Sequence, residues 1–185
     1  MALESFLLIV VCLPFVLFYF WPSSLKAAFK WSPYVSTDKR IIRKALKAAG
    51  LKKGEAIYDL GAGDCRVLII AEKEFGVKPV GFEYSFPIYL LGRLNLLLNK
   101  TKFAKLFNQD LFKADLSSAD VIFLYLTSKV YNREFKQKLE RELKENARVI
   151  VFSTPLKFWP ASKIIPLEER NNKINLYLYS AKKPA

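Results

Sequence analysis

Acidic and glycine residues cluster where a short apolar run ends and a helical pattern begins. Asp59 lies near the end of the run at residues 56–60, and Gly61, Gly63 and Asp64 follow directly. Two glycines around one small residue permit a sharp turn and let a ligand approach the backbone closely. A strand, a tight turn and a helix N-terminus in this order predict a ligand-binding loop.

A second apolar run, residues 79–83, ends in Glu83. It follows the loop at about the ~20-residue separation at which an acid contacts ribose hydroxyls in nucleotide-binding sheets. If both runs are neighbouring parallel strands, their acids meet at the carboxyl edge of the sheet, where open α/β sheets bind ligands.

A dinucleotide fits this loop poorly. Arg66 stands where the dinucleotide fingerprint has its third glycine, and Asp64 lies where pyrophosphate would meet the helix N-terminus. A carboxylate there repels phosphate, whereas the sulfonium and amino groups of S-adenosylmethionine are cationic. We therefore expect S-adenosylmethionine, with Asp59 and Asp64 near its amino-acid end and Glu83 accepting from its ribose hydroxyls.

Composition narrows the chemistry further. The chain has 185 residues, 52% of them hydrophobic, which excludes a disordered chain. The net charge of +13 favours anionic partners such as nucleic acid or an anionic membrane. The absence of histidine excludes histidine bases and histidine-ligated metals, and we expect no metal. Cys12 and Cys65 form no paired motif, which is typical of a reducing compartment.

Residues 6–21 are almost continuously apolar and end in aromatic residues. We expect a single transmembrane helix rather than a cleaved signal peptide, because Glu4 replaces a basic leader and no cleavage site follows. A buried core helix is the third alternative. Residues 22–55 carry nine Lys or Arg against two acids, which predicts an N-terminus outside and a catalytic domain in the cytoplasm. These basic residues are also expected to contact anionic lipid headgroups.

The remaining pattern alternates strands and helices and predicts an α/β fold with a mostly parallel, Rossmann-like sheet. We expect an anchor at residues 1–22, a basic linker with the first helix at 23–55 and the cofactor-binding domain at 56–185. Ser36, Thr37 or Asp38 is expected to cap the first helix. The expected helices are 41–49, 67–75, 87–98 and 129–145. The expected strands of the parallel part are 56–60, 79–83, 103–108, 120–126 and 147–153. Two further strands, 163–170 and 174–180, are expected to form an antiparallel hairpin around a turn at 171–173.

Several separate blocks of residues 31–179 resemble one family. The chain is similar to the small lysine methyltransferases that act on the mitochondrial ATP synthase c-subunit and adenine nucleotide translocase, and to a broad-specificity archaeal protein-lysine methyltransferase. The matching blocks are residues 33–37, 58–64 with Arg66, 81–83, 138–143, 147–150, 159–160 and 176–179. The resemblance implies a seven-stranded class I methyltransferase sheet and protein-lysine methylation.

The resemblance also implies roles for further residues. The segment from Tyr34 to Thr37 would fold over the cofactor as a lid, and Asp110 occupies the position that meets the adenine amine. Tyr125 is our candidate catalytic residue, because it ends the fourth strand facing the transfer site. A turn acid or helix cap is an equal alternative for Asp110, and a core aromatic is the alternative for Tyr125.

The chain departs from the family at two positions. Cys65 replaces the usual glycine and adds a side chain beside the ligand loop, and Ser36 replaces a proline. The strand-four end, residues 124–127, lacks the Asn-Pro-Pro-Tyr motif of adenine and glutamine methyltransferases, which weakens the nucleic-acid interpretation. No base for deprotonating the acceptor is evident.

Together these features predict a membrane-anchored, S-adenosylmethionine-dependent protein-lysine N-methyltransferase. We expect its acceptor to be a lysine of a membrane protein, such as a c-subunit-like loop. Two alternatives stay open: an inactive methyltransferase-fold binding module, and a nucleic-acid or lipid methyltransferase.

Overall fold

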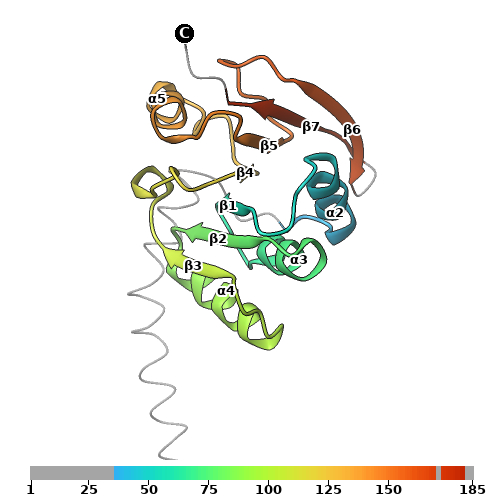
Figure 1. Cartoon of the computed structure of the whole chain (residues 1–185), viewed down its shortest axis with the longest axis vertical. Coiled ribbons are helices and arrows are strands. Elements are labelled where there is room, and N and C mark those ends of the chain that lie inside the picture. Colours follow the sequence, from blue (N-terminus) through green and yellow to red (C-terminus); the bar gives the residue numbers. More distant parts are fainter. Residues whose placement is uncertain (1–35, 170–171, 182–185) are drawn as a thin grey trace, which may run out of the picture.

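The computed structural model describes residues 36–169 and 172–181, and each predicted strand and helix within them is present with small changes at its ends (Figure 1). In chain order the elements are α2 Lys39–Ala48, β1 Ala56–Leu60, α3 Arg66–Phe75, β2 Lys78–Glu83, α4 Phe86–Leu98, β3 Lys105–Asn108, the 3-10 turn η1 Leu111–Lys113, β4 Val121–Leu124, α5 Arg133–Glu142, β5 Arg148–Phe152, β6 Lys163–Glu169 and β7 Asn172–Ser180.

The strands form one sheet in the order β3-β2-β1-β4-β5-β7-β6. β1 pairs in parallel with β2 on one side and β4 on the other, so the winding of the chain reverses between β1 and β4. β7 runs antiparallel to both β5 and β6, which confirms the predicted C-terminal hairpin. The carboxyl ends of β1 and β4 thus form the switch point at which doubly wound sheets bind ligands.

Helices cover both faces of this sheet, with α2, α3 and α4 on one face and α5 on the other (Figure 1). The side chains of β4 alternate between the two helix layers. Val121 and Phe123 pack toward the first layer, formed by α2, α3 and α4, and Ile122 and Leu124 pack toward the second, formed by α5. All four side chains are buried, as expected of a central strand covered on both faces.

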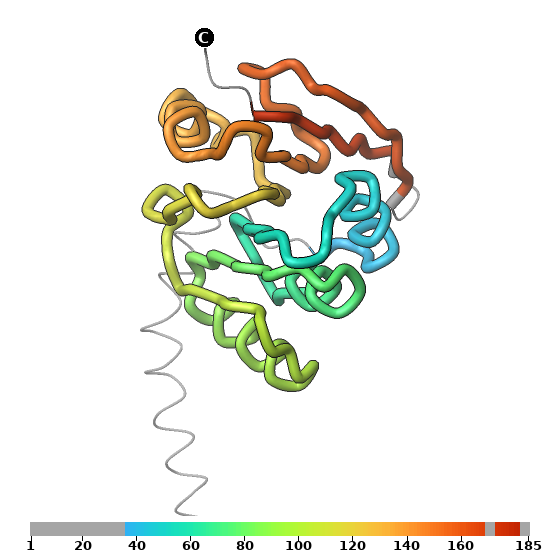
Figure 2. The backbone as a smooth tube through the Cα atoms, in the orientation of Figure 1, coloured from blue at the N-terminus to red at the C-terminus, as the bar shows by residue number. Residues whose placement is uncertain are grey.

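Segments distant in sequence meet in the first layer. Helix α2 lies beside the C-terminal strands (Figure 2), and Ile41 belongs to the same buried cluster as Leu167 and Leu176. The N-terminus of α2 is set by Asp38, whose side chain accepts a hydrogen bond from the Arg40 backbone N at 2.7 Å. Of the three predicted capping residues, Asp38 is therefore the cap.

Several predicted boundaries were wrong, and the structure gives the cause of two of them. The helix predicted at 129–145 begins only at Arg133, because the Asn132 side chain caps it by accepting from the Phe135 backbone N at 3.0 Å. The turn predicted at 171–173 is shorter, because the antiparallel ladder continues to the pair Glu169–Asn172. Only residues 170 and 171 lie between the two strands, which suits the short connections that hairpins favour.

None of the helices within residues 36–169 and 172–181 combines the length and the apolar character that crossing a bilayer requires. The predicted span at residues 6–21 lies outside the described residues, as does Tyr34 of the predicted lid.

Candidate functional site

The loop after β1 turns as its glycines predict. Gly61 and Gly63 have φ angles of 115° and 55°, which residues with side chains rarely adopt. The backbone N–H groups of Gly61 and Ala62 both donate to the Phe82 carbonyl, at 2.9 and 3.0 Å. A Cβ on Gly61 would lie 3.0 Å from the Leu126 side chain. The glycine loop is therefore tied to the end of β2 and passes close to the residues that follow β4.

Two acids that the sequence predicts for this site lie on adjacent strands. Asp59 on β1 is 4% exposed, and the described residues offer its carboxylate no cationic partner. Glu83 ends β2, where its Oε2 accepts from the Gly63 N–H at 3.0 Å and its Oε1 from the Ser85 N–H at 2.7 Å. The Tyr84 N–H also bonds to this carboxylate, which still keeps acceptor capacity for a ligand hydroxyl.

Burial dominates the electrostatics of both acids. It raises the pKa of Asp59 well above its usual value, and the negative charges of Glu83 and Asp64 add to this effect. Burial also raises the pKa of Glu83, although the N–H groups of Ser85 and Gly63 oppose part of the rise. A site with excess buried negative charge attracts a cationic ligand and repels a phosphate.

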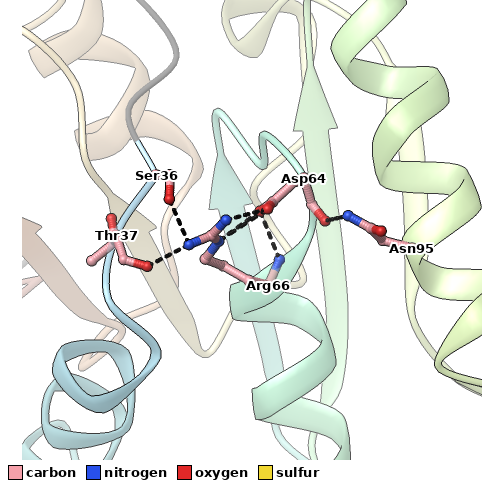
Figure 3. A network of polar contacts seen from close by, with 5 residues as sticks. All are labelled: Ser36, Thr37, Asp64, Arg66 and Asn95. Carbon is pink, nitrogen blue, oxygen red and sulfur yellow. Dashed lines mark hydrogen bonds and ion pairs between the residues drawn. The ribbon is translucent and has the colours of Figure 1, made fainter.

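Asp64 forms an ion pair that sequence reasoning missed. Its carboxylate accepts from the Arg66 guanidinium, whose Nε lies 2.8 Å from Asp64 Oδ1, and Arg66 Nη1 donates to Ser36 Oγ at 2.8 Å and to the Thr37 carbonyl at 2.7 Å (Figure 3). On the other side, Asn95 of α4 donates to the Asp64 carbonyl at 3.0 Å.

This network fastens the described end of the predicted lid to the glycine loop. From the sequence, Arg66 was interpreted as the replacement of a glycine and as part of a family block, without its hydrogen bonds being predicted, and Asn95 was overlooked in a leucine-rich helix. Two sequence features could have revealed this network: Arg66 lies two residues after the loop acid Asp64, and Asn95 is a single amide in an apolar run. Ser36 accepts through its hydroxyl, which the family's proline would lack.

Cys65 departs from the family in the loop, and its thiol packs against Gly92 of α4. Its φ of 65° is the left-handed conformation that glycine adopts most readily. The side chain is fully buried, and a Cβ on Gly92 of α4 would lie 2.7 Å from its Sγ. Burial raises the pKa of this thiol and keeps it protonated.

The remaining predicted residues lie around the same edge. Asp110 follows β3 and caps the η1 turn through the Phe112 N–H at 3.0 Å, and the preceding Gln109 N–H donates to the Glu83 carbonyl at 3.1 Å. Tyr125 directly follows β4, with its ring centroid 5.7 Å from that of Phe152. Thr37 is buried beside Arg66.

These residues fit S-adenosylmethionine. Asp59 and Glu83 concentrate negative charge at the loop, as the cationic amino-acid end of the cofactor requires, whereas the charge of Asp64 is paired with Arg66. Gly61 and Gly63 have positive φ angles and carry no Cβ atom, so a ligand can approach the loop backbone closely at both positions. The binding roles of the individual residues stay predictions.

Comparison with known proteins agrees with this assignment. Residues 59–163 match the ANTKMT methyltransferase domain family. A protein-lysine N-methyltransferase of Saccharolobus islandicus is 34% identical over 149 residues, which cover 80% of this chain and 92% of that protein. The human lysine N-methyltransferase of the ATP synthase c-subunit is 28% identical over 128 residues, covering 69% of this chain and 54% of that relative, so the match spans about half of its length.

A solved structure extends the comparison to the fold and cofactor. The crystal structure of an RNA methyltransferase from Salinibacter ruber in complex with S-adenosyl-L-homocysteine superimposes with a TM-score of 0.76 and 26% identity, covering 82% of this chain and 96% of that one. The fold is thus the Rossmann-like class I methyltransferase fold, and S-adenosylmethionine is the cofactor. The chain belongs to the ANTKMT methyltransferase domain family and is an S-adenosylmethionine-dependent methyltransferase.

Proposed function

We propose that this chain transfers a methyl group to the side-chain amine of a lysine in a protein, at a membrane. The observation that carries the acceptor class is the 34% identity, over 80% of the chain, to a protein-lysine N-methyltransferase. The buried acids at the carboxyl edge of β1 and β2 support the cofactor side of the reaction.

In this proposal each residue of the site contacts a different part of the cofactor. Bound S-adenosylmethionine supplies a methyl group activated by the sulfonium charge. Asp59 holds the cationic amino-acid end, the free lone pairs of Glu83 accept from ribose hydroxyls, and Asp110 meets the adenine amine. Arg66 keeps the Ser36–Thr37 segment beside the loop. This arrangement contributes orientation, which alone supplies a large part of a displacement rate.

The acceptor lysine has to lose a proton before it attacks, since its reference pKa is about 10.4. The chain contains no histidine to act as base. Tyr125, beside the end of β4, lines the slot by which the lysine approaches. Desolvation in that slot lowers the lysine pKa and favours the neutral amine.

Residues 6–21 hold the domain at the membrane, with the basic residues of 22–55 on the cytoplasmic side. Tethering keeps the local concentration of membrane-protein lysines high. The acceptor in this proposal is a lysine in a cytoplasm-facing loop of a membrane protein.

The test is transfer of a labelled methyl group by the full chain reconstituted in membranes. We expect label in protein, lost when acceptor lysines are blocked by acetylation, and lost with Asp59→Asn. Asp120→Asn, at the opposite edge of the sheet, is the matched control and should retain transfer. Label that persists on blocked protein would refute lysine as the acceptor.

The anchor is tested separately with Val11→Arg combined with Val16→Arg, which places two charges in the expected span. We expect methylation of membrane proteins to fall while methylation of a soluble test protein is kept. Equal losses on both acceptors would contradict the anchor.

RNA is a second candidate acceptor, favoured by the net charge of +13 and by the similarity to an RNA methyltransferase. The same assay separates the two, because label in RNA is released by ribonuclease and label in protein by protease. RNA binding would also weaken steeply with salt.

A further inference from the structure

Helix α4 is apolar on two opposite faces. Its inward face packs on the glycine loop, where Gly92 approaches Cys65 and the Gly63 carbonyl, and where Asn95 donates to the Asp64 carbonyl. Its outward face carries five leucines that are between 42% and 74% exposed: Leu90, Leu91, Leu94, Leu97 and Leu98.

The spacing of these leucines places them on one stripe of the helix surface, because residues three, four and seven apart share a face. A surface helix of a water-facing domain normally turns polar residues outward on this face. A contiguous exposed apolar stripe instead marks a contact with another apolar surface.

The rim of the stripe is basic. Residues 84–109 contain no aspartate or glutamate, and three exposed cations lie on α4 or shortly after its C-terminus: Arg93, Lys100 and Lys102. Lys105 on β3 is also exposed, but it alternates with Leu106, which packs on the α4 side of the sheet. The nearby Glu72 of α3 is occupied, because its carboxylate accepts three backbone N–H groups of residues 102–104 at 2.6 to 3.0 Å. Nothing on this segment therefore repels a negatively charged surface.

An apolar stripe with lysine and arginine at its border is the pattern of helices that lie in the plane of a membrane interface. The leucines enter the boundary between headgroups and acyl chains while the cations contact anionic headgroups. Within the described part of the chain, α4 and the β6–β7 hairpin lie at opposite ends (Figure 1).

We propose that the outward face of α4 docks on a bilayer containing anionic lipids. The contact itself rests on α4 alone, and its consequence rests on the proposed function. Because the inner face of α4 touches the glycine loop through Gly92 and Asn95, docking holds the cofactor site about one helix diameter, ~10 Å, from the lipid. Methyl transfer is thereby directed to lysines at the membrane surface.

The test uses the full chain with Cys12→Ser, in which the remaining Cys65 is buried. A polarity-sensitive fluorophore is attached at Leu97→Cys, with Gln137→Cys on the exposed side of α5 as the matched control. Both proteins are reconstituted in vesicles of phosphatidylcholine with phosphatidylglycerol that contain acyl-brominated lipid. We expect quenching at position 97 to exceed that at 137 several-fold.

Three further outcomes test the role of the lysine charges and identify the surface that covers the α4 leucines. Lys100→Glu combined with Lys102→Glu, or vesicles of phosphatidylcholine alone, should reduce quenching at position 97 to the control level. Equal quenching at 97 and 137 overturns the proposal. A benzophenone at position 97 that crosslinks to protein instead of lipid also overturns it, because a protein surface then covers the leucines.

Failure of docking is distinguishable from failure of the proposed function. The same charge-reversed protein is assayed on a soluble acceptor, whose methylation docking does not assist. We expect that activity to be unchanged while methylation of membrane proteins falls several-fold. Retained methylation of membrane proteins would remove the proposed consequence of docking.

Discussion

The two edges of the sheet both carry carboxylates beside β1, but the carboxylates differ in whether a cation pairs with them. At the amino edge, Asp120 accepts from Lys144 Nζ and from the Ala56 N–H, each at 2.8 Å, and Glu55 is paired with Arg148. At the carboxyl edge, Asp59 is buried without a cation among the described residues.

The pKa values follow this difference. Burial acts to raise the pKa of Asp120, yet the hydrogen bonds from Lys144 and Ala56 hold it below its usual value. Burial raises the pKa of Asp59, and no described cation opposes it. A buried charge without a partner costs stability, so its retention indicates a ligand that compensates it. Four of the residues that line a hollow at the amino edge form two ion pairs, Lys144 with Asp120 and Arg148 with Glu55, so this hollow indicates structure rather than binding.

Removing the unpaired acid should have the largest effect. Asp59→Asn is expected to weaken S-adenosylmethionine binding at least ~30-fold, about 2 kcal/mol, because a charged partner of the ligand is lost. The free energy of unfolding without ligand should stay equal or rise. Titration calorimetry and urea unfolding of the full chain measure the two quantities. Unchanged binding with lowered stability would show that Asp59 behaves like the amino-edge acids.

The mirror change is Arg148→Met at the amino edge. Its guanidinium donates to the Ala49 and Gly50 carbonyls, each at 2.6 Å, and to Glu55. Their loss should lower the free energy of unfolding by about 1–3 kcal/mol, with S-adenosylmethionine affinity unchanged in the folded protein. Urea midpoints and calorimetry check this. A loss of affinity larger than the loss of stability would contradict the separation of the two edges.

Arg66→Lys should have an intermediate effect. Lysine keeps a positive charge near Asp64 but cannot donate in a fork to Asp64, Ser36 and Thr37 together. We expect KM for S-adenosylmethionine to rise about 3- to 10-fold, near 1 kcal/mol, with a smaller change in kcat. Ser36→Ala, which removes a single acceptor, should give a smaller rise in KM. An effect confined to kcat would indicate a role in transfer instead of in holding the lid.

The smallest expected effect is a difference between Asp59 and Asp120 in how their contributions to stability depend on pH. The unfolded-state pKa of aspartate is about 3.9, and burial raises the pKa of Asp59 above this value, so the folded state binds more protons. Its contribution to stability therefore falls as pH rises through the raised pKa. Asp120 has a lowered pKa and acts oppositely, adding stability that is lost as pH falls through that value.

Thermal unfolding of the ligand-free chain across pH separates the two signs. Asp59→Asn should flatten the decline toward higher pH, and Asp120→Asn should flatten the decline toward acid. Identical profiles for the two variants would mean that both acids are equally compensated in the folded protein.

Much of the site was predictable because it depends on local rules. Positive φ angles at residues 61 and 63 follow from glycine, and Asp38 caps α2 within two residues of its partner. Strand and helix order follows from periodicity. The errors lay at ends, where Asn132 shortened α5 and the ladder to Asn172 shortened the hairpin turn. A local side-chain cap sets the first of these ends and strand pairing sets the second, and hydrophobic periodicity shows neither.

The sequence by itself determined the glycine loop, the acids that end β1 and β2, and the alternation that makes the fold α/β. Tertiary structure alone decided the strand order that places Asp59 beside the end of β2, the hydrogen bonds by which Arg66 reaches Ser36 across 30 positions, and the outward turn of the α4 leucines. The reason is physical: torsional preference and periodicity act over a few residues, whereas partners of buried charges and uncovered apolar faces are set by contacts between distant segments.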